Sequence, residues 1–169
     1  MAKATTTENT KKELNLDAKV TVRSISTWPI GFPRRSDGNG TTSGVSFQPL
    51  GIARLSRNEI IAQVQSGNVL FTGTDGQGNH ASLIIEDAPT RVEIGFESDD
   101  GTEKQFVLTA ERIKEIFDIR NQQEFERRIQ ECIVTRDEKE YVIHLIRELN
   151  LNDYSKIRYI EKFVEQNVL

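Results

Sequence analysis

The feature that most constrains this chain is the distribution of glycine and proline. All 11 glycines and all 4 prolines lie at or before Gly101. These two residue types interrupt helices, because glycine is conformationally free and proline lacks the backbone N–H. The C-terminal part, residues 109–169, is therefore predicted to be helical, and the turns of the fold must lie before it.

Capping residues divide this C-terminal part into four short helices. Thr109, Asn121 and Thr135 each stand where a side-chain oxygen can cap a helix, the last two with a glutamate three residues later, and a fourth helix is expected to begin near Asp153. Short links between short helices require repeated reversals, so we predict a compact antiparallel cluster. The apolar residues at helical spacing, expected to form its core, are Ile113, Ile116, Phe117, Phe125, Ile129, Cys132, Ile133, Val142, Leu145, Ile146, Leu149, Ile157, Ile160, Phe163 and Val164.

Residues 19–108 are predicted to form an antiparallel β module, because short β-favouring runs alternate with turn residues. The clearest run is 91–97, which is expected to form a hairpin with 104–108. Further strands are expected at residues 20–28, 45–52 with a bend at Pro49, 68–72 and 81–85. The predicted fold class is α+β, an N-terminal antiparallel β module with one short helix, followed by a compact C-terminal cluster of about four short helices.

One short helix and one long loop are expected within the β module. Ser56 and Glu59 have the spacing of a capping box, and Gly67 supplies the left-handed residue that ends a helix. Residues 29–44 are predicted to form a long loop, and such loops are usually functional or disordered. Residues 1–18 are predicted to be a flexible N-terminal arm, because they are too polar to offset the entropy of ordering.

The residue types that most often carry catalysis or bind metals are sparse. Cys132 is the single cysteine and is expected in the helical core, while His144 lies on a helix and His80 in a turn. One cysteine excludes an intramolecular disulfide, and two distant histidines leave no histidine-rich metal site. Residues 75–80 (DGQGNH) lack the spacing of a calcium or phosphate loop, so a tight hairpin turn between the strands 68–72 and 81–85 is expected. We predict a non-enzymatic protein without metal or cofactor.

Residues 28–35 (WPIGFPRR) are the strongest candidate for a binding site. Tryptophan and arginine are enriched at interface hot spots, and proline stiffens the backbone that presents them. The alternative is that Trp28 and Phe32 fold back to cover one end of the sheet. The residues predicted to bind a partner are Trp28, Ile30, Phe32, Arg34 and Arg35.

Charge is distributed unevenly along the chain, whose net charge is −4. Residues 1–84 hold 9 Lys/Arg and 6 Asp/Glu, whereas residues 85–169 hold 13 and 20. Opposite charges suit contacts between copies, although such a bias is also common in monomers, and the acidic excess argues against nucleic acid as a partner. Mixed-charge helix faces such as 136–140 (RDEKE) are expected to be solvated. No apolar run is long enough to span a bilayer or to form a secretory signal, so no membrane partner is expected.

The organisation of the chain resembles that of minor virion structural proteins of tailed bacteriophages, of the head decoration, stabilisation or head-tail joining type. The shared features are the Thr-rich arm of residues 1–18, a β module with an aromatic loop, the helical cluster and the lack of a catalytic set. This resemblance implies a virion subunit, assembled in the host cytoplasm, that contacts capsid, neck or tail proteins through its arm and loop. No motif is shared, so no residue role is carried over. The alternative is a cytoplasmic regulatory or adaptor module that binds a protein or nucleic acid through Arg34 and Arg35.

Overall fold

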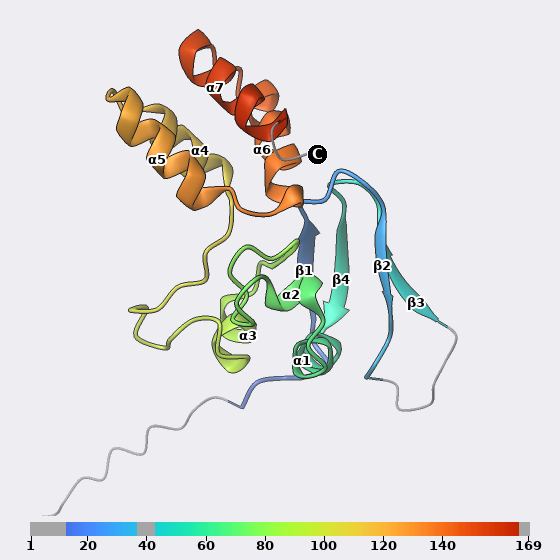
Figure 1. Ribbon diagram of the computed structural model, residues 1–169. Helices are drawn as coiled ribbons and strands as arrows, with labels where there is room; N and C mark the ends of the chain where they lie inside the picture. Colours follow the sequence, from blue (N-terminus) through green and yellow to red (C-terminus); the bar gives the residue numbers. More distant parts are fainter. Residues whose placement is uncertain (1–12, 37–42, 166–169) are drawn as a thin grey trace, which may run out of the picture.

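The computed structural model describes residues 13–36 and 43–165, and these form an α+β fold (Figure 1). No helix in these two ranges is long and apolar enough to cross a membrane. The elements are β1 (Lys19–Ser24), β2 (Ile30–Pro33), β3 (Gly44–Phe47), β4 (Ile52–Ser56), α1 (Arg57–Gln65), α2 (Val69–Thr72), β5 (Leu83–Ile85), α3 (Ala88–Glu93), α4 (Ala110–Phe117), α5 (Gln122–Cys132), α6 (Arg136–Glu148) and α7 (Tyr154–Glu165).

Strand β1 lies at the centre of a three-stranded antiparallel sheet, between β4 and β5. Val20 of β1 pairs with Leu55 of β4, and both side chains are buried. The single strand predicted over 45–52 is instead two strands, β3 and β4, because the chain turns after Pro49. Proline removes a ladder hydrogen bond, so the bend was readable from the sequence, whereas the change of sheet was not.

The predicted long loop over residues 29–44 begins with a strand. Strand β2 pairs with β3 in a separate antiparallel sheet, with Phe32 opposite Val45. The Phe32 ring lies 5.5 Å from that of Phe71, in an edge-to-face arrangement. The loop prediction was therefore wrong for β2, because burial of one aromatic side chain outweighs the weak strand propensity of Gly and Pro. Residues 37–42 lie outside the described ranges.

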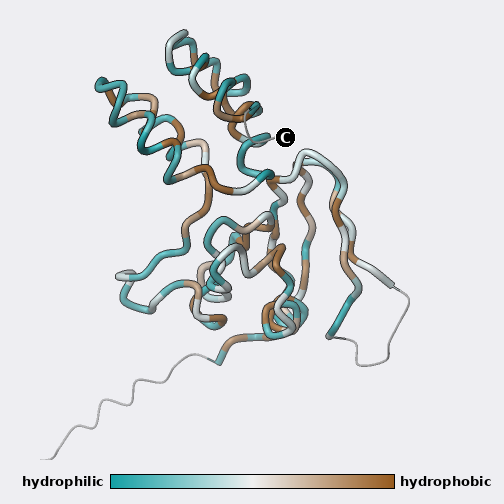
Figure 2. Tube along the Cα trace, in the orientation of Figure 1, coloured by the Kyte–Doolittle hydropathy of each residue, from teal (hydrophilic) through white to brown (hydrophobic). Residues whose placement is uncertain are grey.

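Two hydrophobic cores lie in the molecule, one in each module. The first packs around the two sheets with α1 and α2, and includes Val22, Phe47, Leu55, Ile60 and Phe71. The second lies among α4–α7 and contains all of the residues predicted for it from helical spacing. Figure 2 shows hydrophobic and hydrophilic residues alternating along these helices, as the amphipathic pattern predicted.

The predicted capping residues begin their helices as expected. The side chains of Thr109, Asn121 and Thr135 each accept a hydrogen bond from a backbone N–H of α4, α5 and α6, respectively. Ser56 likewise caps α1, but the reciprocal half of the predicted capping box is not formed, because the Glu59 carboxylate accepts from the backbone of residues 35–36 instead. At α6 the capping box is complete, because the Glu138 carboxylate also accepts from the Thr135 backbone.

Two predicted strands are helices, so the β module contains α1, α2 and α3 rather than one helix. Residues 68–72 form α2, where the Asn68 side chain caps the first turn. Residues 91–97 contain the end of α3, which begins with the Asp87 cap and has Pro89 in its first turn. An acidic cap followed by proline is a helix-start signal, and it outweighs the short period-two pattern that follows it.

The predicted hairpin partner, residues 104–108, contacts the turn at residues 75–80 instead. The backbone N–H of Phe106 donates to Asn79 Oδ1 at 2.6 Å, and the His80 N–H donates to the Phe106 carbonyl at 3.1 Å. Residues 75–80 do form a turn, but the hairpin predicted around it is absent, because residues 69–72 are helical and no strand directly precedes the turn. These long-range hydrogen bonds engage the backbone N–H and C=O of Phe106, which a hairpin would have used.

Residues 13–18 lie against the start of α1. The backbone N–H of Asn58 donates to the Leu16 carbonyl at 2.9 Å, and that of Arg57 donates to the Ala18 carbonyl at 3.1 Å. The last six residues of the predicted flexible arm are thus attached to the β module. The rest of that prediction, residues 1–12, lies outside the described ranges.

Candidate functional site: an anchored arginine segment

The five residues predicted to bind a partner lie in different surroundings. Phe32 is only 9% exposed and belongs to the β-module core, so it is not available to a partner in the folded protein. Trp28 and Ile30 are half-buried, whereas Arg34 and Arg35 are exposed. Of the predicted set, only the arginine pair is fully presented to a partner.

Trp28 contacts the helical module. The Arg136 guanidinium lies 4.7 Å from the centre of the Trp28 ring, and the neighbouring Thr27 hydroxyl donates to the Glu140 carboxylate. A cation over an indole ring is attracted by its π electrons. Trp28 therefore folds back, as the alternative interpretation required, but it contacts α6.

Carboxylates at the start of α6 attach the helical module to the β module. Nδ1 of His80 lies 2.7 Å from Glu138 Oε1, and the Ser82 hydroxyl donates to Asp137. Asp137 and Glu138 are 8% and 0% exposed, so the prediction of a solvated face at 136–140 was wrong for both. Their partners lie more than 50 residues away in the sequence, and sequence pattern carries no signal for such pairs.

A cleft of about 630 Å³ lies where the two modules meet. Tyr141 and His144 stack beside it with their rings 6.2 Å apart, and burial raises the pKa of Tyr141. Cys132 does not line this cleft, since it is buried in the helical core, where burial raises the pKa of its thiol. The chain segments described here hold no group of three or more His, Cys, Asp or Glu side chains placed to bind a metal ion.

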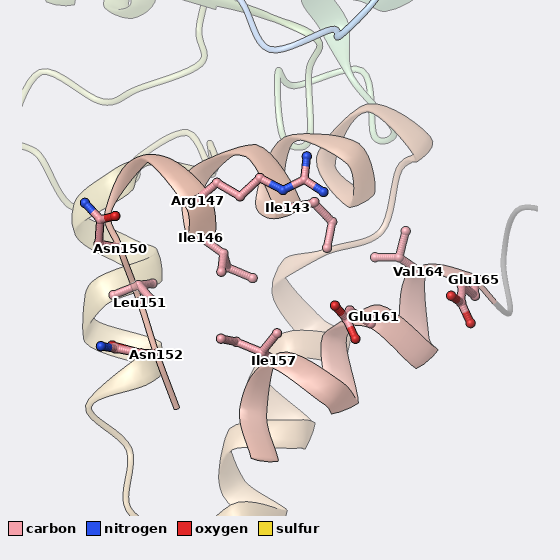
Figure 3. A pocket seen from close by; sticks show the side chains of 10 residues that line it. All are labelled: Ile143, Ile146, Arg147, Asn150, Leu151, Asn152, Ile157, Glu161, Val164 and Glu165. Carbon is pink, nitrogen blue, oxygen red and sulfur yellow. The ribbon is translucent and has the colours of Figure 1, made fainter. Parts of the chain in front are cut away.

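A second opening, a groove of about 720 Å³, lies between α6 and α7 (Figure 3). Ile143 and Ile146 of α6 face Ile157 and Val164 of α7 across it. Arg147 extends over one side of the groove. The groove offers an apolar floor but no buried polar group that would select one ligand.

The most distinctive polar structure in the β module holds residues 33–36, which we call the arginine segment. The backbone N–H groups of Arg35 and Ser36 donate to the Glu59 carboxylate at 3.0 and 2.9 Å. The carbonyl oxygen of the first residue of the segment accepts from Gln63 Nε2 at 2.8 Å. Glu59 and Gln63 lie one turn apart on α1 and are 0% and 1% exposed. The backbone on both sides of the arginine pair is thus fixed from within the module.

Further hydrogen bonds hold the anchoring side chains in place. Gln63 Nε2 also donates to Glu59 Oε1 at 2.7 Å, and Asn68 Nδ2 donates to Gln63 Oε1 at 2.9 Å. Burial by itself raises the pKa of Glu59, but the hydrogen bonds from Ser36, Gln63 and Arg35 outweigh it, so the pKa lies below its usual value. Glu59 is therefore an ionised, buried carboxylate. The sequence predicted it only as a capping-box partner of Ser56.

The two guanidinium groups of the arginine segment form no ion pair within the described residues. Within the described part of the β module, ion pairs are formed by Arg23, Arg57 and Arg91, but none is formed by Arg34 or Arg35. A guanidinium group pairs with carboxylate or phosphate oxygens through two parallel hydrogen bonds. The segment therefore presents two such groups on a fixed backbone. No protein-family model, curated protein or solved structure matches this chain.

Proposed function

We propose that this protein is a non-enzymatic assembly subunit that holds a neighbouring protein through the arginine segment. The observation that carries the proposal is the exposed pair Arg34 and Arg35 on a backbone fixed by the buried Glu59. A segment that is already ordered loses less entropy when it binds, so its contacts contribute more to affinity. A partner surface rich in carboxylates fits this site, because it completes the charge of both arginines.

The setting that we propose is a bacteriophage particle, in which such a subunit joins capsid, neck or tail proteins. The resemblance in chain organisation supports this setting. The polar contacts between the modules also support it, because they hold both modules together as one subunit. His80 with Glu138 and Ser82 with Asp137 provide this connection.

Sedimentation of extracts from cells that make the protein tests this function. The wild-type chain is expected in the fractions of large particles, and the double variant Arg34→Ala, Arg35→Ala is expected to shift to the fractions of small proteins. The matched control is Arg127→Ala, Arg128→Ala, which removes the same charge from the exposed face of α5. Wild-type protein found only among small proteins would contradict an assembly role.

The second candidate function is that of a regulatory or adaptor module, which uses the same arginines to bind a protein or nucleic acid. Two unpaired guanidinium groups also fit phosphate oxygens, which is the observation that favours nucleic acid. Binding to a labelled oligonucleotide, measured against salt, separates the two functions. Phosphate contacts give an affinity that falls log-linearly with salt, with a shallower slope in the double alanine variant. No binding at low salt would exclude the nucleic-acid form of this alternative.

A further inference from the structure

We infer that the arginine segment binds an acidic groove beside α3 on a second copy of this chain. This inference rests on the proposed function, because it names the partner of the arginine segment. The contact is head-to-tail, so that one copy contributes the arginines and the next copy contributes the groove.

The floor of this groove is apolar and lies between residues 13–16 and α3. Leu16, Pro89 and Val92 line it, and Leu16 is 43% exposed although it belongs to a well-attached segment. An exposed leucine alone needs no explanation, but here it continues an apolar strip formed by a second element. Burial against another protein surface would remove this strip from water.

The rim of the groove is acidic. Glu13 and Glu93 line it from its two sides, both are exposed, and neither forms an ion pair within the described residues. On the α3 side the surrounding sequence is also acidic, since residues 85–108 hold seven Asp/Glu but only two Lys/Arg. The acidic excess of the second half of the chain thus lies mainly in this part of the β module and not in the helices.

The arginine segment is complementary to this groove in two respects. Its two arginines match Glu13 and Glu93 in charge, and the exposed Pro33 provides an apolar group for the floor. Electrostatic complementarity of this kind fixes which surfaces meet and speeds their encounter. The chain itself therefore carries both halves of the contact.

The two halves are separated within one molecule. In Figure 1, α1 lies between the end of β2, where the arginine segment begins, and α3. The contact is therefore expected between copies and uses two different surfaces of the chain. Such a heterologous contact repeats from copy to copy, and it closes into a ring or continues as a filament.

Charge reversal on the full-length chain tests this contact by analytical ultracentrifugation. Wild-type protein should associate as its concentration rises, and added salt should weaken this association. The variants Arg34→Glu, Arg35→Glu and Glu13→Lys, Glu93→Lys should each raise the dissociation constant by about 30-fold or more, because each brings like charges together. An equimolar mixture of the two variants should associate again, since every contact between one variant and the other joins opposite charges.

The mixture separates a loss of charge complementarity from misfolding, because two misfolded variants could not associate with each other. Circular dichroism melts of both variants provide the folding control. A wild-type chain that stays monomeric at every concentration, or a mixture that fails to associate, would overturn the second-copy contact. Neither outcome contradicts the assembly function, which the particle fractions test separately. Loss of association in the arginine variant but not in the groove variant would place the arginines against another surface.

Discussion

The helical module and the β module are stabilised by different kinds of interaction. In α4, α5 and α6, each helix begins with its own side-chain cap and buries an apolar face at regular spacing. In the β module, buried polar side chains hold distant segments together, as Glu59 holds residues 35–36 and Arg57 holds Asp87. Local signals therefore dominate in the first module, whereas the second adds many contacts between residues remote in sequence.

Matched leucine truncations in the two cores should give the largest effects. Leu145→Ala in the helical core and Leu83→Ala in the β core each remove a fully buried side chain, so each should lower the free energy of unfolding by about 2–5 kcal/mol. Denaturant unfolding measures this loss, and native-state hydrogen exchange shows where protection is lost. We expect the greater loss in the module that carries the substitution. Equal loss in both modules would show that the two cores unfold as one unit.

Removing the carboxylate between the modules should have the next largest effect. Glu138→Ala leaves the Thr135 and Val134 N–H groups without their acceptor and His80 without its partner, so it should cost about 1–3 kcal/mol. Glu148→Ala, at the exposed end of the same helix, is the control and should change stability by about 0.5 kcal/mol or less. Similar effects of the two substitutions would mean that the junction contributes little to folding.

Neutralising the carboxylate that anchors the arginine segment should have a moderate, pH-dependent effect. Glu59→Gln replaces charge-assisted hydrogen bonds with neutral ones and should cost about 1–2 kcal/mol at pH 7. The pKa of Glu59 is lowered in the folded state, so its contribution is present above the unfolded value of 4.5 and is lost as the pH falls through the folded pKa. The stability gap between wild type and variant should therefore close on acidification. Urea unfolding at pH 7 and below pH 4.5 measures it, and a gap independent of pH would contradict an ionised Glu59.

The smallest effects should come from helix caps, one in each module. Ser56→Ala and Thr109→Ala each remove a side-chain acceptor from the first turn of a helix, and each should cost about 1 kcal/mol. The two substitutions should differ in their effect on hydrogen exchange in the arginine segment. Ser56 begins the helix that carries Glu59, so Ser56→Ala should also reduce hydrogen-exchange protection at Arg35 and Ser36, whereas Thr109→Ala should not.

Local chemistry explains which predictions from the sequence were confirmed. The α+β class, the four C-terminal helices, their caps and their buried faces all follow from spacings of a few residues. The turn at residues 75–80 and the left-handed exit at Gly67 follow from residues that tolerate positive φ. Segments 68–72 and 91–97 were predicted as strands from β-favouring runs, although the Asn68 and Asp87 caps of α2 and α3 were also local signals.

The candidate site shows what local patterns do not determine. The sequence alone identified Arg34 and Arg35 as candidates, together with Trp28, Ile30 and Phe32, because an aromatic, proline-rich segment with paired arginines has the composition of an interface. Only the tertiary structure decided that Phe32 belongs to the core, that Glu59 fixes the arginine segment and that Glu138 joins the modules. The physical reason is that the cost of burying a carboxylate depends on the groups around it. For Glu59 and Glu138 these groups include the N–H of Arg35 and Ser36 and the His80 ring, which lie 23 to 58 positions away in the sequence.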